Sequence, residues 1–373
     1  MVPISPENTE LREFFVYKSH PAYYYVLVIL GAASDATLDN DAPGFCSWGR
    51  SSFYGENFMD EKIFKTYTEL KDLLILRGMI VEHPRFFTNC MAKDTYYNII
   101  NGYKKYFIAS LNPEKYHSGT TFEQVYALYS FDQTIRTLFL TELLKIEKNL
   151  KSLIAYHFSE SYGHNHHKYL DIENFKNNSS KNRNYAVNTI SSIERDLKKY
   201  SKHGNTSICH YLKRHKYVPL WVLFGVLSFG RIAHFYSCMK LEDQQKVSAH
   251  FDMSAKTLDG FFYFLDSCRN TCAHGNRIYT SNIDKKFQHF IPDTKIHCDL
   301  QIPKNKSGNY LHGKTDILAM LISFKIFLCK SDFSQLKKKF KKAHKHIEKV
   351  IPEHVLANID KEMGISNALL ALL

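Results

Sequence analysis

Residues 122–158 read FEQVYALYSFDQTIRTLFLTELLKIEKNLKSLIAYHF, and this stretch decides the fold class. Its apolar residues recur every three or four positions, which is the spacing of one face of an α-helix. These residues are Val125, Leu128, Ile135, Leu138, Ile146, Leu150, Leu153 and Ile154. Two pairs, Asp132 with Arg136 and Glu147 with Lys151, have the i, i+4 spacing of stabilising ion pairs. The stretch therefore predicts one long helix, Phe122 to Phe158, as the scaffold of a helical bundle.

Helical spacing is also present on both sides of this scaffold. Upstream, it predicts a helix from Lys62 that ends at Arg77-Gly78, and downstream Ser254 is a good N-cap for a helix that runs to His274-Gly275. Further helices are predicted over about 90–97, 99–108, 221–239 (entered through Pro219), 315–329 and 334–350, whereas the polar residues 171–207 predict a partly helical, solvent-facing insertion. The sequence contains no internal repeat and no convincing strand run, so the expected fold class is all-α.

The composition is that of a folded, basic protein. A hydrophobic content of 44% with 23% charged residues is typical of a globular chain and not of a disordered one. Lys and Arg number 49 against 37 Asp and Glu, and the net charge of +12 favours polyanionic partners, nucleic acid first and an acidic membrane surface second. The eight cysteines lack a CxxC pair, which predicts reduced thiols in a cytoplasm. The apolar run 22–32 is shorter than the roughly 20 residues of a membrane span, so neither secretion nor a span is expected.

The sequence divides into three expected parts. Residues 1–58 contain several Pro and Gly and no sustained period, so we interpret them as an N-terminal extension of unknown role. A small appended element and a misassigned start are the alternatives. Residues 59–290 are expected to contain the helical core, and residues 291–373 to form a C-terminal helical region.

The segment Arg269-Asn270-Thr271-Cys272-Ala273-His274-Gly275 is the place where local chemistry and local structure agree on a site. Asn270 and His274 share a helix face, and Arg269 lies about 140° round from His274 on an ideal helix. The long Arg side chain and the helix end at Gly275 still let the two groups converge. RNA cleavage without metal needs a base for the 2′-OH proton, an acid for the leaving 5′-oxygen and a cation on the phosphate, and His and Arg can supply these. The alternative is a polar helix end capped by His, since cations favour helix C-termini.

Two further residues, one in this motif and one after it, also have alternative interpretations. Arg277 is expected to lie beyond the helix, where it either reaches a phosphate or remains a solvated loop residue. Asn270 either hydrogen-bonds His274 and fixes its tautomer or satisfies its own helix.

A second candidate RNA contact is the basic run near the C-terminus. Leu336, Phe340, Ala343 and Ile347 form the apolar face of an amphipathic helix there. Its other faces carry Lys337, Lys338, Lys341 and Lys342, which form either an ordinary solvated face or an RNA-backbone contact. His164, His166 and His167 have no Cys or carboxylate at zinc-ligand spacing, and no nucleotide-binding glycine motif is present. No metal and no cofactor are therefore expected.

Ordered segments spread over about residues 60 to 285 resemble the Abi (abortive infection) family, in particular its AbiD and AbiF branch. They are Tyr96 to Phe107 (YYNIINGYKKYF), Leu128 to Asp132 (LYSFD) with Arg136, Ile146 to Lys148 (IEK), Tyr217 to Trp221 (YVPLW) with Leu227 to Gly230 (LSFG), and Arg269 to Arg277 (RNTCAHGNR). The resemblance implies a HEPN-superfamily helical domain in which Arg-x4-His is the ribonuclease signature. It also implies a role in abortive infection, where an infected bacterium is halted before phage multiply. Residues 1–58 match nothing in the family.

The leading hypothesis is a metal-independent endoribonuclease toxin, with His274 as the proton-transfer residue and Arg269 as the phosphate clamp. One motif supplies one histidine, so a homodimer with a composite active site is expected. The alternative is a non-catalytic RNA-binding module, or one sequestered by RNA, within a defence or toxin–antitoxin system. Expected partners are RNA as substrate and a regulatory antitoxin RNA, without a membrane.

Overall fold

The predicted scaffold helix is α3, Phe122–Tyr162, which is 41 residues long. Thr121 and Gln124 form a reciprocal capping box at its start, in which each side chain accepts a hydrogen bond from the other residue's backbone N–H. Gly163 ends the helix with a φ of 93°, a conformation that favours glycine. The prediction from the apolar stripe is confirmed, and the helix extends four residues further than expected.

The computed structural model describes residues 63–280 and 290–372, so the expected extension 1–58 lies outside the described residues. Within these residues the fold is all-α, as predicted, apart from one small hairpin. Before α3 come α1 (Tyr67–Leu76), α2 (Pro84–Lys93), the π-helix η2 (Tyr97–Asn101), the 3₁₀-helix η3 (Lys104–Tyr106), β1 (Ile108–Leu111) and β2 (Glu114–Tyr116). After it come α4 (His166–Tyr169), η4 (Ile172–Asn174), α5 (Ser180–Lys202), α6 (Thr206–His215), α7 (Leu220–Val226), α8 (Phe229–Cys238), α9 (Leu241–Ala249), α10 (Ala255–Ala273), α11 (Lys295–Asp299), α12 (Ile317–Phe327), α13 (Lys330–Ile347), α14 (Glu353–Met363) and α15 (Asn367–Leu372).

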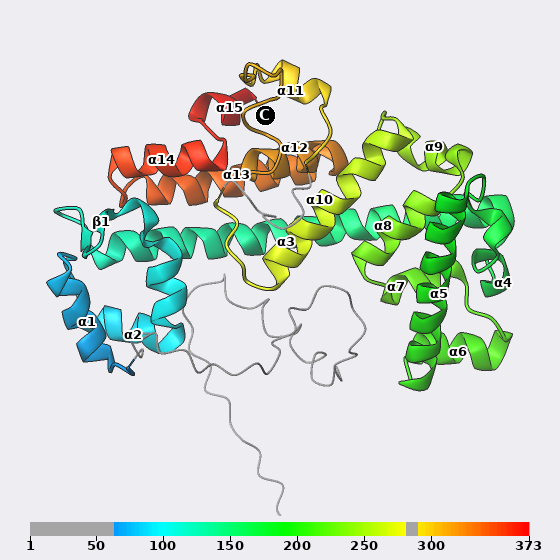
Figure 1. Cartoon of the computed structure of the whole chain (residues 1–373), viewed down its shortest axis with the longest axis horizontal. Coiled ribbons are helices and arrows are strands. Elements are labelled where there is room, and N and C mark those ends of the chain that lie inside the picture. Colours follow the sequence, from blue (N-terminus) through cyan, green and yellow to red (C-terminus); the bar gives the residue numbers. More distant parts are fainter. Residues whose placement is uncertain (1–62, 281–289, 373) are drawn as a thin grey trace, which may run out of the picture. The chain divides into compact units, whose positions relative to one another are not determined.

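Helix α3 is the element around which the others pack (Figure 1). Helices α7, α8, α9, α10, α12 and α13 and the π-helix η2 all contact it. The buried ring of Phe139 on α3 lies 5.1 Å from Phe324 of α12 and 5.9 Å from Phe340 of α13, measured between centroids. Such aromatic contacts add to the hydrophobic stabilisation of burial. The C-terminal helices are thus fixed to the scaffold.

The predictions differ from the structure in several segments. Where a helix was expected over 99–108, the chain forms a π-helix and a 3₁₀-helix and then enters an antiparallel β1–β2 hairpin, which was not predicted. Ile108, the last residue of the predicted helix, instead pairs with Tyr116 across this hairpin. Helices α14 and α15 were also missed. The apolar stretch 221–239 is two helices, because Leu227 is extended and Ser228 caps a new helix by accepting a hydrogen bond from the Arg231 N–H.

The prediction of a partly helical segment over 171–207 is confirmed, but the segment is not only solvent-facing, because one face of it is buried. It contains the 23-residue helix α5, which packs on α8. The buried face consists of Ala186, Thr189, Ile193 and Leu197. These four residues have helical spacing, but two of them are small. The many Asn, Ser and Lys residues around them make the spacing hard to recognise in the sequence. None of the helices in residues 63–280 and 290–372 has the length and apolar content needed to span a bilayer.

His344 joins α13 to α14 and predicts a pH-dependent stability. Its buried ring lies 2.7 Å from Asp360 through Nε2 and 3.1 Å from Glu348 through Nδ1. Burial alone would lower the pKa of His344, but the hydrogen bond to Asp360 and both carboxylate charges outweigh it and raise the pKa. A raised pKa in the folded state means that this contribution is complete below the unfolded pKa of about 6.5 and is lost as the pH rises through the folded value.

We therefore expect His344→Gln to lower the free energy of unfolding more at about pH 6 than at about pH 8.5, because only wild type gains the charged pairing at low pH. Urea unfolding of both proteins at the two pH values measures the difference. The exposed His346 on the same helix gives the control, His346→Gln, which should lower the free energy of unfolding less than His344→Gln does at about pH 6. Equal losses for His344→Gln at both pH values would contradict the prediction.

Candidate functional site

The motif forms the last turn of α10, as predicted. Ser254 caps the helix start by accepting a hydrogen bond from the Thr257 N–H at 3.1 Å. His274 is the C-cap residue, and its N–H donates to the Asn270 carbonyl at 2.9 Å. Gly275 then leaves the helix with a φ of 72°. The His274 side chain is exposed at this helix end.

Helix α3 holds the chain that follows the motif. The Asp132 carboxylate is fully buried and accepts hydrogen bonds from the backbone N–H groups of Ile278 (3.0 Å) and Tyr279 (2.9 Å). Arg136, whose Nε lies 3.5 Å from Asp132, donates to the backbone carbonyl of Gly275. Burial raises the pKa of the Asp132 carboxyl, and the Arg136 charge and these hydrogen bonds oppose that rise. The predicted i, i+4 pair thus anchors the turn that carries His274.

A pocket with a volume of about 340 Å³ lies beside this turn. One wall is His274 to Arg277, and the opposite wall comes from the chain around the π-helix η2, more than 170 residues earlier in the sequence. Helix α3 contributes Tyr129 and Arg136, and the remaining lining residues are Asp94, Tyr97, Asn98, Asn101, Gly102 and Tyr103. π-Helical turns are often found at functional sites. The pocket therefore combines cationic, imidazole, amide and aromatic groups.

Arg277 joins the two walls of the pocket. It lies beyond the helix, as expected, and its guanidinium donates to the Gly102 carbonyl at 2.6 Å. A Cβ on Gly102 would lie 3.6 Å from the Arg277 Cδ, so the Arg277 stem packs closely on the glycine. Part of its hydrogen-bonding capacity is thus used to hold the pocket together.

Asp94 is a carboxylate of the pocket that the sequence analysis did not identify. Its side chain accepts hydrogen bonds from the Tyr129 hydroxyl (2.6 Å) and the Asn98 amide (2.7 Å). Burial would raise the pKa of Asp94, but the hydrogen bonds from Tyr129, Asn98 and the Thr95 N–H together outweigh it and leave the pKa below its usual value. Asp94 is therefore a charged acceptor, and it orients Asn98.

Arg269 and Asn270 lie outside the pocket lining. The Arg269 Nε is 3.4 Å from Glu147 of α3, and its Nη1 donates to the Asn270 side-chain oxygen at 3.3 Å. Glu147 is also paired with Lys151 at 2.7 Å. Burial raises the pKa of Asp266, and the nearby Arg269 charge opposes this effect. The structure thus brings His274 and Arg277 together at the pocket, whereas Arg269 is paired with Glu147 and with Asn270 outside the pocket lining.

The basic amphipathic helix is α13, and its lysines do not line the pocket. The apolar face that was predicted packs on α3 and α12, with Leu336, Phe340 and Ile347 buried. Lys338, Lys341 and Lys342 are exposed, whereas Lys337 is half-buried and its pKa is lowered by burial and by the neighbouring Lys341 and Lys325 charges.

Eight lining residues were not given a role from the sequence: Asp94, Tyr97, Asn98, Asn101, Gly102, Tyr103, Tyr129 and Asn276. Most lie within or beside the segment Tyr96 to Phe107 that carried the family resemblance. Tyr97 and Asn101 are four residues apart, and Tyr97 is 71% exposed, which is unusual for a large aromatic side chain. An exposed Tyr and several amides in one short segment were the available signal. Among the described residues, no group of three or more His, Cys, Asp or Glu side chains is placed to hold a metal ion.

The comparison with protein families identifies the chain. The model of the Abi-like protein family matches residues 89–280, just over half of the sequence. The matched region includes both walls of the pocket, the long helix α3 and the motif at the end of α10. Searches of curated proteins and of solved structures each returned no match. On the extent of the family match, the chain belongs to the Abi-like protein family.

Proposed function

We propose that this chain is an endoribonuclease that acts in abortive infection and cleaves RNA without a metal ion. Membership of the Abi-like family suggests the role in phage defence. The observation that carries the proposed chemistry is the position of His274, exposed at the rim of a pocket that also contains Arg136 and Arg277. The pocket volume of about 340 Å³ is within the range of small-ligand sites.

The proposed reaction is an in-line attack of a ribose 2′-oxygen on the adjacent phosphorus. A base removes the 2′-OH proton while the P–O5′ bond breaks, and an acid protonates the 5′-oxygen that leaves. The products are a 2′,3′-cyclic phosphate and a 5′-hydroxyl, so no water or metal is consumed in this step. Histidine performs such proton transfers near neutral pH, and each is typically worth about 10² to 10⁴ in rate.

Arg269 is proposed as the phosphate clamp of this reaction. Its contact with Glu147 and Asn270 fixes one side of the guanidinium and leaves the side chain 32% exposed. A planar guanidinium has five N–H donors, so a group held in this way can still bind a phosphate. His274 supplies one imidazole, whereas the reaction is better served by an acid and a base. We therefore propose a homodimer in which two copies of the motif form a composite active site.

A non-catalytic RNA-binding module is the second candidate. The observation that favours it is the engagement of Arg136 and Arg277 by backbone carbonyls and of Arg269 by Glu147, an arrangement that also suits a fixed binding surface. In that case a structured RNA, including an antitoxin RNA, would occupy the pocket without being cut. End-labelled RNA incubated with the protein in EDTA separates the two. Cleavage that His274→Ala abolishes supports the enzyme, and tight binding without cleavage supports the module.

The lysines of α13 are proposed to contact the RNA backbone. Changing Lys337, Lys338, Lys341 and Lys342 to Gln is expected to weaken RNA binding and to flatten its salt dependence. The slope of the logarithm of the binding constant against the logarithm of the salt concentration should become less steep by about 2.8, since each phosphate neutralised on a single strand contributes about 0.7. The complex that still forms should be cleaved normally, because these lysines do not line the pocket.

Filter binding at several salt concentrations, run beside a cleavage assay, measures these effects separately. His274→Ala is the complementary variant and should lose cleavage while its salt slope is unchanged. If the salt dependence of RNA binding is unchanged in the quadruple Gln protein, the lysines of α13 form an ordinary solvated face and do not contact RNA.

A further inference from the structure

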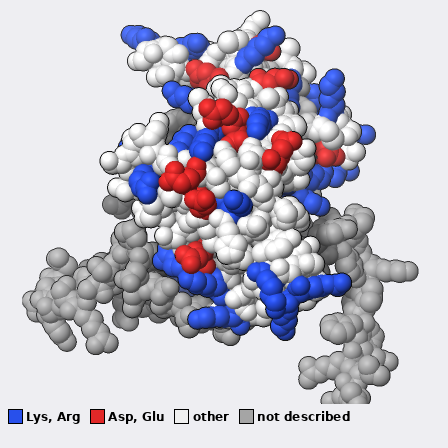
Figure 2. Space-filling view, turned by 90° about the vertical axis from the view of Figure 1, so that its right-hand side faces the viewer, with Lys and Arg blue, Asp and Glu red and all other residues white. Residues whose placement is uncertain are grey.

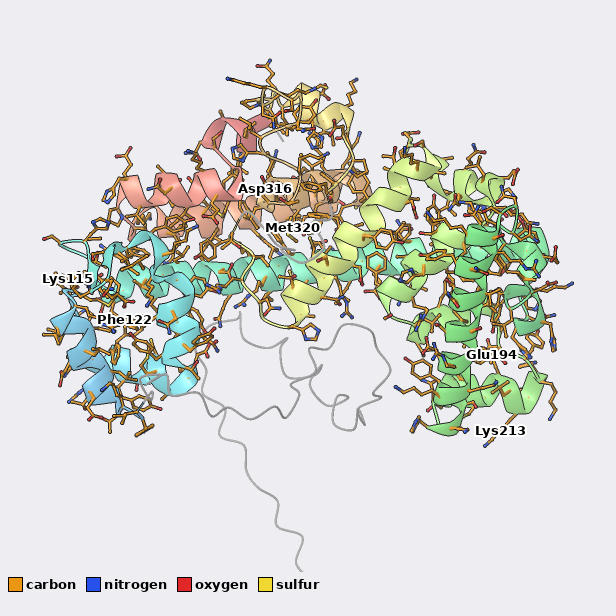
Figure 3. The ribbon with its side chains drawn as sticks, in the orientation of Figure 1. Lys115, Phe122, Glu194, Lys213, Asp316 and Met320 are labelled. Carbon is orange, nitrogen blue, oxygen red and sulfur yellow. The ribbon has the colours of Figure 1, made fainter. Side chains whose placement is uncertain are left out.

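The chain between Asp196 and Glu242 contains no acidic residue but eight Lys or Arg residues. Helix α6 lies within this stretch, and Lys213, Arg214 and Lys216 at its end are all exposed. Figure 2 views the molecule from the right-hand side of Figure 1, and Lys and Arg side chains gather along its lower edge. Figure 3 labels Lys213 at the lower right of the molecule. Such a concentration of unopposed positive charge attracts phosphate groups.

Aromatic and imidazole rings form a continuous series beside these cations. The ring centroids of Tyr211 and His215 are 5.3 Å apart, and those of His215 and Tyr217 are 6.2 Å apart. His164 lies 5.3 Å from Tyr217 and 5.4 Å from Trp221. Trp221 is 51% exposed at the end of the series. The rings are therefore in mutual contact, and about half of the largest one, Trp221, is exposed to solvent.

The backbone holds this series in place. The Leu220 N–H donates to the His164 carbonyl at 3.0 Å, and the Tyr169 hydroxyl donates to the Val218 carbonyl at 2.8 Å. Lys216 ends α6 in the left-handed region, with a φ of 66°, and directs the chain back toward His164. Rings that are ordered before a ligand arrives lose little conformational entropy on binding.

We propose that this ring-and-cation surface binds single-stranded RNA, with bases stacked on the rings and phosphates held by the cations. The surface consists of His164, Tyr211, Lys213, Arg214, His215, Lys216, Tyr217 and Trp221. Alternating aromatic faces and positive charges are the way in which proteins bind single strands without strong sequence preference. The surface is separate from the pocket at His274, so this inference goes beyond the proposed cleavage and does not depend on it.

An anionic membrane would attract the same cations, but the apolar groups needed for insertion are missing here. Interfacial helices insert an apolar face of several large side chains. On the described helices α6 and α7, Trp221 is the one large hydrophobic side chain that is exposed, while Ile208 and Leu223 are buried. RNA is therefore the occupant that this surface fits best.

The test is a fluorescence anisotropy titration of the full chain with a labelled 2′-O-methyl RNA of about 16 nucleotides, a length that covers known single-strand sites. This RNA has no free 2′-OH, so cleavage cannot interfere. Trp221→Leu should weaken binding by on the order of ten-fold, because an aliphatic chain cannot stack on a base, whereas Trp221→Tyr should bind like wild type. Lys213→Gln combined with Arg214→Gln should lower the log-log salt slope by about 1.4.

Matched controls come from exposed residues elsewhere in the fold. Tyr67→Leu on α1 removes another exposed ring, and Lys115→Gln with Lys256→Gln removes the same charge; neither should change binding. Cleavage is measured separately with unmodified RNA, so failure of the cleavage proposal is distinguished from failure of this one. Equal binding by wild type and Trp221→Leu would overturn the inference. The inference would also be overturned if Trp221→Leu bound the RNA like wild type but lost binding to phosphatidylserine vesicles. The surface would then be a membrane contact.

Discussion

Replacing His274 by Ala is expected to reduce RNA cleavage by about 10² to 10⁴ and to abolish toxicity, because the imidazole is the proposed proton-transfer group. The free energy of unfolding should fall by no more than about 1 kcal/mol, since the side chain is exposed at a helix C-terminus and contributes little packing. Single-turnover cleavage of end-labelled RNA, with urea unfolding of the same preparations, measures both quantities.

The exposed His117 provides the matched control, and His117→Ala should cleave like wild type. Arg269 is better tested by Arg269→Lys than by Ala, because Ala would leave the buried Glu147 without one of its two cationic partners. Lysine keeps the positive charge but not the planar fork, so cleavage should fall while the fold is retained. A folded His274→Ala protein that still cleaves at the wild-type rate would place the chemistry elsewhere.

The main features of the fold could be predicted because they rest on local patterns. The apolar stripe from Val125 to Ile154 is long enough to specify a helix without tertiary information, and Ser254 with Gly275 marks both ends of α10. The hairpin at 108–116 and the buried face of helix α5 were not recognised for the opposite reason. The two strands of the hairpin are only four and three residues long, which is too short for a clear alternating pattern. Helix α5 has a narrow buried face within a polar sequence.

The site was predictable only in part, because a pocket depends on contacts between distant segments. His274 and Arg277 were identified from a motif of nine residues, and both line the pocket. The opposite wall, with Tyr97 and Asn98, comes from the beginning of the matched region, and nothing local in the sequence shows that it meets the end of α10. The same limit applies to Arg269, whose pairing with Glu147 joins two helices that are over 100 residues apart in sequence.

Removing the Asp132 carboxylate is expected to have the largest effect on stability. Asp132→Ala should lower the free energy of unfolding by about 3–5 kcal/mol, because it leaves the largely buried Arg136 without its carboxylate partner. It also leaves the backbone N–H groups of Ile278 and Tyr279 without their acceptor inside the protein. Urea unfolding monitored by circular dichroism measures this loss.

The control is Glu194→Ala on α5, which breaks an exposed i, i+4 pair with Lys198 at 2.9 Å and should cost no more than about 0.5 kcal/mol. Asp132 contacts no group that reacts in the proposed mechanism, yet it fixes the turn next to His274. At a temperature where Asp132→Ala is still folded, cleavage should therefore fall further than the folded fraction does, because His274 is less well positioned. If Asp132→Ala is as stable as Glu194→Ala and cleaves normally, then α3 does not hold the motif in place. The shape of the pocket would then not depend on the Asp132–Arg136 pair.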